Sequence, residues 1–365
     1  MIRLDWNLDR SMLLATLILV CVGLVMVFSA SIPTSQAKFH SPHFLFYRQL
    51  AWAAIGVFVF LLVVQMRLQW LTNRWVVATA LVVTYVLLAL VFTQSPINGT
   101  QRWLHAFGVS FQPSELAKLT TILFLSYYLS RAPDLRERPF LHLLRIAAPI
   151  VPMLALIVFE PDLGSVVILL VIVLLYLFLA GFPVLKLALA GAAVLPVLVV
   201  VVLSSPYMLN RIRTFMAPDA DPRGIGYHIN QSLIAMGHSG FWGLGLGEST
   251  QKLYFLPEPH TDFIFAVVGE ELGFLGCLAI VALFGYLFCR GIKAAIQNPV
   301  PMFNWLGLGL ITLIVIEVLI NTSMVISLGP TKGIPLPFIS MGGTSLLINL
   351  LAMGVVINFS REYAE

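Results

Sequence analysis

The sequence is short of charge. Only 10% of its 365 residues are Asp, Glu, Lys or Arg, whereas a soluble domain carries roughly 25%. Hydrophobic residues make up 59% of the chain, and apolar runs about as long as a membrane helix recur along it. This composition excludes a soluble globular domain and predicts an all-α polytopic membrane protein, built as one helical bundle over residues 1–365.

Cysteine and basic runs are also scarce. Cys21, Cys277 and Cys289 lie in apolar runs without CxxC spacing, so no disulfide or metal framework is expected. The net charge is +4, but the sequence has no basic run, and its Lys and Arg residues lie mostly in short loops. Such charges orient membrane helices rather than bind DNA or RNA, so we expect no nucleic-acid partner.

Ten apolar segments each approach the ~20 residues that a helix needs to cross a bilayer. They are 12–30, 46–66, 74–94, 112–130, 143–159, 163–181, 184–205, 263–289, 303–328 and 340–359. The first exceeds the apolar core of a signal peptide, and two acidic residues dilute its positive start. We therefore expect a retained first helix, with cleavage near Ser29–Ser31 as the alternative.

Lys and Arg residues favour one side of these ten segments. Twelve lie on the side of the N-terminus: Arg3, Arg10, Arg67, Arg74, Arg131, Arg136, Arg138, Arg145, Lys186, Arg290, Lys293 and Arg361. The short loops of the opposite side hold four: Lys38, Arg48, Arg102 and Lys332. The positive-inside rule predicts that both termini are cytoplasmic.

One connection, residues 206–262 between the seventh and eighth segments, is far longer than an ordinary loop. It is rich in Gly and Pro, but it also carries many aromatic and aliphatic residues, which a disordered linker lacks. We expect an ordered extracytoplasmic cap with short amphipathic helices at the membrane surface.

Polar residues gather where this cap enters the eighth segment. Asp262 follows His260 and Thr261, and a carboxylate there would also serve as a plain helix cap. Glu270 and Glu271 follow two turns later, and ionisable residues inside a span are costly and usually functional. The crowding favours a functional site over a simple cap.

Three further polar stretches fall on the same predicted side. Glu115 and Lys118 are three residues apart at the start of the fourth segment and share a helix face, as a structural ion pair would. The others are "EPDLGS" at 160–165 and the Pro- and Gly-rich 329–345, which predicts a bent or broken helix start. Glu317 lies mid-span, either paired with Lys118 or another polar neighbour or marking an ion path.

Cations and carboxylates on one side of a membrane protein indicate a particular class of substrate. Arg102, Lys118, Arg213 and Lys332 would bind phosphate, and carboxylates would remove protons or hold a divalent ion. We therefore expect an outward-facing cavity for an anionic, lipid-linked substrate.

Three motifs resemble the SEDS family (shape, elongation, division and sporulation). They are "RIRTF…DP…GYH…QSL", "GLGLGESTQKLYFLPEPHTDFIFAVVGEELG" and "PTKGIPLPFISMGGTSLL", and the resemblance extends over nearly the whole chain. The stretches "GLGLGESTQKL" and "PTKGIPLPFIS" resemble the division-type branch more than the elongation-type branch. Met341 and His228 stand where the family commonly has Tyr and Gln, which affects only fine substrate contacts.

The resemblance implies ten transmembrane helices with a large extracytoplasmic loop between helices 7 and 8, in the inner membrane of a bacterium. It implies a peptidoglycan glycosyltransferase that polymerises lipid II, with its active site facing outside. The expected partners are a class B penicillin-binding transpeptidase and other division proteins. The family's essential aspartate falls on Asp262, its Q-P-S-E-x-x-K motif on Gln112–Lys118, and its P-D-L-G motif on Pro161–Gly164.

The candidate site follows from this chemistry. The diphosphate leaving group needs charge stabilisation, and the attacking sugar hydroxyl needs a general base, for which Asp262 is the candidate in an inverting transfer. Supporting or substrate-binding roles are expected for Arg102, Trp103, Gln112, Ser114, Glu115, Lys118, Asp162, Arg213, His260, Thr261, Lys332 and Ser340. The only cofactor expected is a divalent cation, Mg or Mn. A lipid II flippase, an elongation-type polymerase and a non-catalytic scaffold are the alternatives.

Overall fold

The structure is a computed structural model, which describes residues 9–95, 101–106, 109–132, 139–204, 209, 227–253, 255–329 and 333–360. Its long helices match the ten predicted segments. They are α1 (Arg10–Phe39), α2 (Phe44–Gln65), α3 (Arg74–Val91), α4 (Pro113–Leu129), α5 (Pro139–Phe159), α6 (Leu163–Leu179), α7 (Val184–Ser204), α10 (Ile264–Ile296), α11 (Pro301–Val325) and α12 (Gly343–Phe359). The predicted all-α membrane fold is confirmed.

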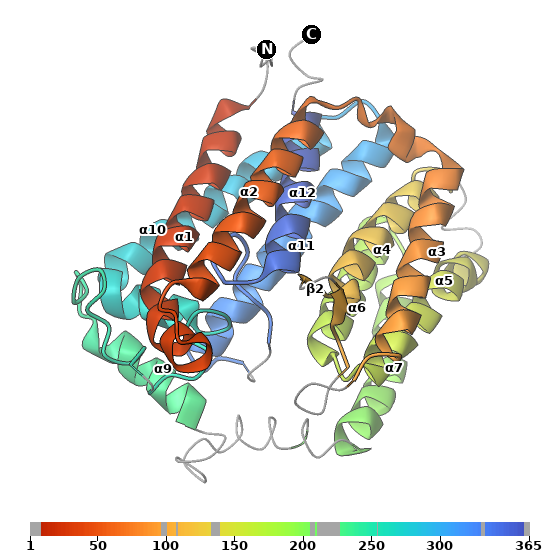
Figure 1. Cartoon of the computed structure of the whole chain (residues 1–365). Helices are drawn as coiled ribbons and strands as arrows, with labels where there is room; N and C mark the ends of the chain where they lie inside the picture. Colours follow the sequence, from red (N-terminus) through yellow and green to blue (C-terminus); the bar gives the residue numbers. More distant parts are fainter. Residues whose placement is uncertain are drawn as a thin grey trace.

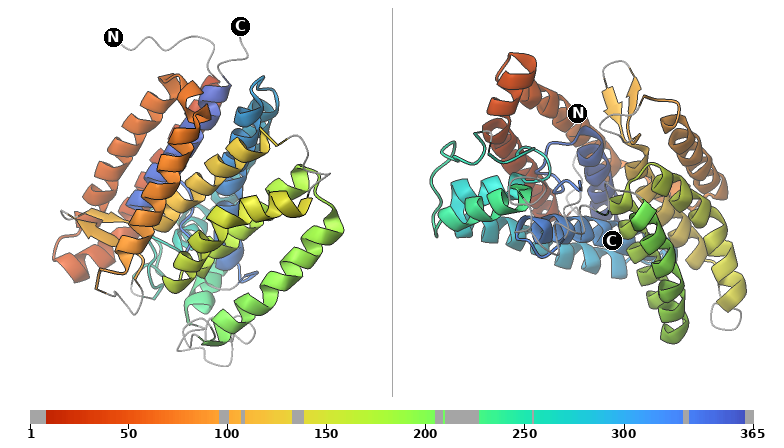
Figure 2. Two further views of the ribbon diagram at one scale, coloured as in Figure 1. Left: turned by 90° about the vertical axis from the view of Figure 1, so that its right-hand side faces the viewer. Right: turned by 90° about the horizontal axis from the view of Figure 1, so that it is seen from below.

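Six of these helices, α1, α2, α3, α5, α10 and α11, are long and apolar enough to cross a membrane. Two short additions complete the described fold before the cap: the 3-10 helix η1 (Leu68–Thr72) and an antiparallel hairpin of β1 (Leu104–Ala106) and β2 (Val109–Phe111). The helices form two groups that diverge toward one end of the molecule (Figure 1). One group holds α1, α2 and α10 to α12, the other holds α3 to α7, and α4 packs against α11 and α12 to join them (Figure 2).

Both ends of the described chain lie at the other end of the bundle. The Asp9 N–H donates to Ser360 Oγ (3.4 Å), which joins the start of α1 to the end of α12. Arg290, near the end of α10, forms an ion pair with Asp9 (Nη2–Oδ2, 2.6 Å). The shared location agrees with an even number of crossings, and the assignment of this end to the cytoplasm stays a prediction of the charge count.

The long connection contains an ordered helix, as expected. Helix α9 (Tyr227–His238) buries Ile229 and Ala235 against α10 and α11 and exposes Leu233 and Ile234 on its other face. Most of the first half of the connection, including Arg213, lies outside the described residues.

Helix α10 is broken at Gly273, whose φ of 69° lies in the left-handed region that favours glycine. A break exposes backbone groups that need partners inside a membrane protein. The turn 240–245 supplies them. Its Leu244 and Gly245 N–H groups donate to the carbonyls of Glu270 and Glu271, and the N–H groups of Phe274 and Leu275 donate to the carbonyls of residues 240 and 241 (3.0–3.3 Å). The turn therefore replaces the helical bonds that the break removes.

These hydrogen bonds bring the backbone of Gly243 into contact with α10 at the break. A Cβ on Gly243 would lie 2.3 Å from the Glu271 carbonyl oxygen, whereas a Cβ on Gly247 would meet nothing within 4 Å. Both residues have positive φ (79° and 86°), so alanine at either costs about 1 kcal/mol of backbone strain. We expect Gly243→Ala to cost at least about 2 kcal/mol more than Gly247→Ala, seen as a lower thermal midpoint of the purified protein. Equal midpoints for the two variants would contradict this packing.

Candidate functional site

The turn that carries Asp262 is held by its backbone. Ser340 Oγ donates to the Thr261 carbonyl (2.7 Å) and accepts from the Leu336 N–H (2.8 Å). The Met341 N–H donates to the His260 carbonyl (2.9 Å). The segment before α12 therefore fastens the 260–262 turn through main-chain groups.

Asn321 of α11 completes this attachment. Its Nδ2 donates to the carbonyls of Asp262 (2.9 Å) and Ile334 (2.8 Å), and the residue is fully buried. Sequence reasoning missed Asn321, because a single amide within an apolar helix carries no signal of what it binds. It fixes the position of the Asp262 main chain without using the carboxylate.

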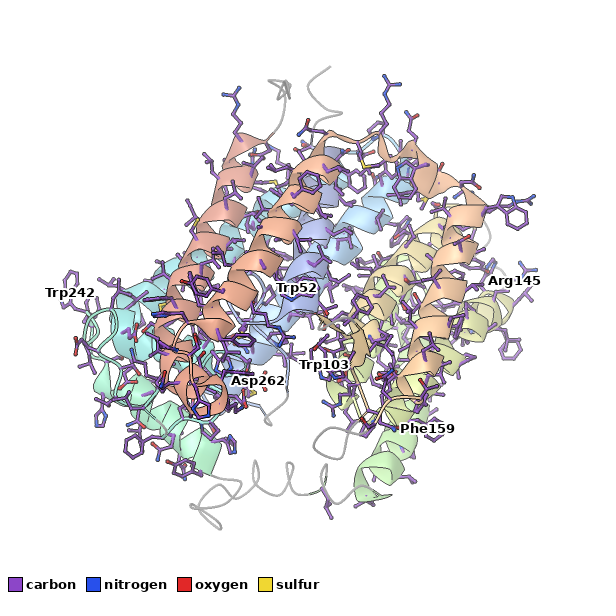
Figure 3. The ribbon with its side chains drawn as sticks, viewed as in Figure 1. Trp52, Trp103, Arg145, Phe159, Trp242 and Asp262 are labelled. Carbon is purple, nitrogen blue, oxygen red and sulfur yellow. The ribbon has the colours of Figure 1, made fainter. Side chains whose placement is uncertain are left out.

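The Asp262 side chain is half-buried, and a Cβ on Gly333 would lie 3.4 Å from its Oδ2. Figure 3 places it at the divergent end of the bundle, on the opposite group of helices from Trp103. The N-cap of α10 is Phe263, so Asp262 precedes the cap position. The alternative that Asp262 is itself the N-cap residue is therefore wrong.

His260, beside Asp262, is buried. Burial lowers its pKa below 6.5, although the Glu258 carboxylate opposes the shift and Lys38 adds to it. The Glu258 carboxylate lies 3.6 Å from His260 Nε2 and also forms an exposed ion pair with Lys38 (3.3 Å). His260 is therefore neutral at neutral pH, and Asp262 has no imidazolium as a neighbour in the 260–262 turn.

Asp162 is the N-cap of α6 and joins α6 to α4. Its carboxylate accepts from Ser165 N (3.3 Å), Ser165 Oγ (2.8 Å), Ser114 Oγ (2.9 Å) and Gln112 Nε2 (3.1 Å). Burial alone would raise its pKa, but the Arg102 charge and these donors hold it below 3.8. The predicted cluster of Gln112, Ser114 and Asp162 is thus brought together, and its visible role is to align two helix starts.

The Arg102 guanidinium is fixed beside this cluster. It donates to the carbonyls of Glu160 (Nε, 3.3 Å) and Pro161 (Nη2). Trp103 beside it is 36% exposed, as an aromatic at a membrane interface would be. Of the other three cations predicted to bind phosphate, Arg213 and Lys332 lie outside the described residues, and Lys118 is described below.

Glu160 is fully buried, and neither of its carboxyl oxygens has a hydrogen-bond partner in the described part of the chain. Burial raises its pKa to about 8; the Asp162 charge adds to the shift and Arg102 opposes it. The carboxyl group is therefore protonated at neutral pH. The sequence places Glu160 and Asp162 in one turn, but it does not reveal that Glu160 is protonated while Asp162 is ionised.

Because folding raises the pKa of Glu160, the stability of the protein should depend on pH. Unfolded Glu160 ionises near 4.5 but the folded residue stays protonated to about 8, so its contribution to stability falls as pH rises through that interval. Glu160→Gln has the shape of the neutral acid and cannot ionise. We expect it to be more stable than the wild type by a few kcal/mol near pH 8 and to match it near pH 5, in thermal unfolding. Glu248→Gln, at an exposed carboxylate, serves as control; a pH-independent difference for Glu160→Gln would contradict the assignment.

Hydrogen bonds connect the start of α12 and the segment before it to α2 on one side and to the residues before α4 on the other. Gln49 of α2 donates to the Ser340 carbonyl (3.3 Å) and accepts from Gly342 N (3.3 Å). Thr344 Oγ1 donates to the Ser110 carbonyl (3.2 Å) and accepts from Gln112 N (3.3 Å). The starts of α4, α6, α10 and α12 therefore converge, and their dipoles favour a negatively charged ligand there.

Lys118 lies between two carboxylates. Its Nζ donates to Glu115 Oε1 (2.8 Å) and to Glu317 Oε1, and Asn349 Nδ2 donates to Glu317 Oε2 (3.1 Å). Lys118, Glu115 and Glu317 are at most 3% exposed. The Lys118–Glu317 pairing left open by the sequence is confirmed. Lys118 is thus buried between two carboxylates, which fits a role in orienting the site, and its binding of phosphate stays a prediction.

Glu270 and Glu271 also have structural partners. The Glu270 carboxylate accepts from the Thr250 N–H and hydroxyl (both 3.0 Å) and from the Ser249 hydroxyl. Glu271 Oε1 accepts from Lys252 Nζ (2.8 Å) and Ser29 Oγ (2.6 Å). The pair fastens the cap to α10 and α1, so the structure replaces the functional-site interpretation of these two carboxylates with an anchoring role.

Within the ranges that the structure describes, no three His, Cys, Asp or Glu side chains gather as a metal cage would. Mg²⁺ commonly binds through one or two carboxylates together with substrate phosphates. The half-buried Asp262 carboxylate beside convergent helix starts suits that second mode.

Comparison with known proteins gives a consistent result. The family model described as "Cell cycle protein", for FtsW, RodA and SpoVE, matches residues 9–365. The chain is 38% identical to the "Probable peptidoglycan glycosyltransferase FtsW" of Trichlorobacter lovleyi, covering 96% of this chain and 93% of the relative. It is also 38% identical to the "Stage V sporulation protein E" of Bacillus subtilis, covering 97% of each.

Solved structures share the fold. One, described in "Structural coordination of polymerization and crosslinking by a peptidoglycan synthase complex", is 25% identical with a TM-score of 0.79, covering 98% of this chain and 99% of that one. The crystal structure of RodA from Thermus thermophilus is 24% identical with a TM-score of 0.72, covering 99% of both chains.

Proposed function

Because the chain belongs to the FtsW, RodA and SpoVE family of cell cycle proteins, the SEDS family, we propose that it is a peptidoglycan glycosyltransferase of the FtsW type. It polymerises lipid II at the outer face of the cytoplasmic membrane during cell division. The observation that supports this best is the placement of Asp262 on a rigid turn where four helix starts converge.

The site provides for both halves of a glycosyl transfer. Asp262 acts as the general base that removes the proton from the acceptor sugar hydroxyl, whose oxygen attacks the anomeric carbon as the bond to the lipid diphosphate breaks. Attack from the face opposite the leaving group inverts the anomeric centre. The turn is preorganised, because its three carbonyls are bound by Ser340, Met341 and Asn321.

The leaving diphosphate needs positive charge rather than a proton. The converging helix starts supply partial positive charge, and Arg102 supplies a guanidinium that two backbone carbonyls already hold in place. Mg²⁺ or Mn²⁺, bound through the substrate phosphates, would neutralise further charge, and Asp262 would then stay available as the base.

The partner is a class B penicillin-binding transpeptidase, which cross-links the glycan strands that this chain makes. The similar structure from a synthase complex that couples polymerisation to cross-linking supports this pairing. The relatives named FtsW and SpoVE favour a division-type enzyme over an elongation-type one.

The proposal is tested with purified protein and its cognate transpeptidase, given lipid II in detergent. We expect glycan polymer that a muramidase digests. In a parallel assay with vesicles, we expect no transbilayer movement of labelled lipid II. Movement of lipid II without polymer would overturn the polymerase in favour of a flippase.

A further inference from the structure

Residues 240–247, here called the apolar turn, present large hydrophobic side chains to the surroundings. Phe241, Trp242, Leu244 and Leu246 are 56%, 78%, 46% and 59% exposed. Figure 3 shows Trp242 at the outer edge of the molecule, beside α1 and α10. A contiguous exposed apolar patch of this kind marks contact with a second apolar phase.

The apolar turn is not a loose loop. Its backbone replaces the bonds lost at the Gly273 break, and the Glu270 carboxylate fastens the residues that follow it. Because the backbone of the turn is hydrogen-bonded to α10, the exposed side chains are held on the outside of the molecule. Its depth relative to the rest of the bundle is fixed by the fold.

The length of α1 gives that depth. Its Asp9 end forms the ion pair with Arg290 of α10, and its Ser29 binds Lys252, which also binds Glu271 of α10. Twenty positions separate Asp9 from Ser29. At 1.5 Å per residue this is about 30 Å, equal to the ~30 Å thickness of a bilayer's hydrocarbon core.

A charged pair at one end and a polar triad at the other are the groups expected at the two boundaries of that core. The apolar turn lies next to the triad, so it lies at the outer boundary. Its patch is continuous with the exposed apolar face of α10, where Phe274 and Leu278 are 55% and 49% exposed. Phe241 also contacts Phe274, with ring centroids 5.6 Å apart.

We propose that the apolar turn is a lipid anchor, inserted at the boundary between headgroups and acyl chains of the outward-facing leaflet. Trp and Phe favour that boundary because their rings are amphipathic or apolar and rigid. Continuity with the exposed apolar face of α10 favours phospholipid as the occupant, because the acyl chains that cover that face extend to the turn. The anchor holds the outer end of α10 at a constant depth, and it does so whether or not the chain polymerises lipid II.

The test uses spin labels on single cysteines in proteoliposomes of phosphatidylcholine and phosphatidylglycerol. Cys21, Cys277 and Cys289 are first replaced by alanine. A label is then placed by Trp242→Cys, with Glu248→Cys, an exposed acidic position one residue beyond the turn, as the aqueous control. Leu278→Cys on the exposed face of α10 is the hydrocarbon control.

Oxygen concentrates in the bilayer, whereas a neutral nickel chelate stays in water. We expect the label at 242 to collide more with oxygen than with nickel, like the label at 278, and the label at 248 to show the reverse. Nickel accessibility at 242 equal to that at 248 would overturn the anchor. Loss of both accessibilities at 242 would also overturn it, by showing a second protein copy on the turn.

A measurement without labels checks the same point if the cysteine-free protein does not fold. Fluorescence of the native tryptophans is measured in liposomes of brominated lipid, for the wild type and for Trp242→Phe. We expect the substitution to remove a strongly quenched component. An unchanged quenched fraction would contradict insertion of Trp242.

Discussion

Replacing Asp262 by asparagine is expected to lower lipid II polymerisation by about 10²–10⁴-fold, the usual contribution of a general base. Asparagine has nearly the same shape but cannot accept the proton of the acceptor hydroxyl. Asp262→Ala should lose at least as much. The measurement is the initial rate of glycan formation by the variant in complex with the transpeptidase.

The fold should survive both changes, since the turn is fastened through the carbonyls of His260, Thr261 and Asp262 and not through the carboxylate alone. Thermal midpoint and partner binding are therefore expected to stay near wild type. Glu258→Gln is the matched control, because it removes a half-exposed carboxylate four residues away whose ion pair with Lys38 lies at the surface and whose other neighbour is the neutral His260 ring. Polymerisation by Asp262→Asn at the rate of Glu258→Gln would exclude the base assignment.

The second large effect is expected at Lys118. Lys118→Met preserves much of the side-chain volume but leaves Glu115 and Glu317 buried without their cation. Breaking a buried ion pair from one side costs about 3–5 kcal/mol, and we expect a loss of that order in the free energy of unfolding. Thermal or denaturant unfolding in detergent measures it.

Two controls test whether the loss of stability comes from the two buried carboxylates left without a cation or from the removal of a lysine side chain as such. Lys38→Met makes the same substitution at an exposed ion pair and should change stability by no more than about 1 kcal/mol. Adding Glu115→Gln and Glu317→Gln to Lys118→Met removes the uncompensated charge and should recover part of the loss. A triple variant less stable than the single one would show that charge compensation is not the reason.

The arrangement of helices was predictable, because hydropathy alone determines which segments can cross a bilayer. All ten segments appear as helices, and the bent start before α12 appears where Pro and Gly predicted it. The break at Gly273 was not predictable. A glycine inside an apolar run leaves hydropathy unchanged, and the break depends on bonds to a turn about thirty residues earlier in the chain.

The contacts of the polar residues were also predictable only in part: those within one helix could be predicted, and those between helices could not. Glu115 and Lys118 could be paired from their spacing, since neighbours on one helix face are set by local geometry. The partner of Glu317, the anchoring roles of Glu270 and Glu271, and the contacts of Asn321 depend on which helices pack together. Sequence could identify Asp262 through its family resemblance, but only the structure shows how its turn is fastened.

The Lys118 pairing also bears on the order in which the protein is made. Helix α4 leaves the ribosome long before α11, since Glu317 follows Lys118 by 199 residues. Glu317 therefore does not yet exist when α4 meets the membrane insertion machinery. Glu115, three residues before Lys118, lets α4 partition as a locally neutral pair. Glu317 is made later. When it pairs with Lys118 and Asn349, the newly made C-terminal helices pack against the helices already in the bilayer.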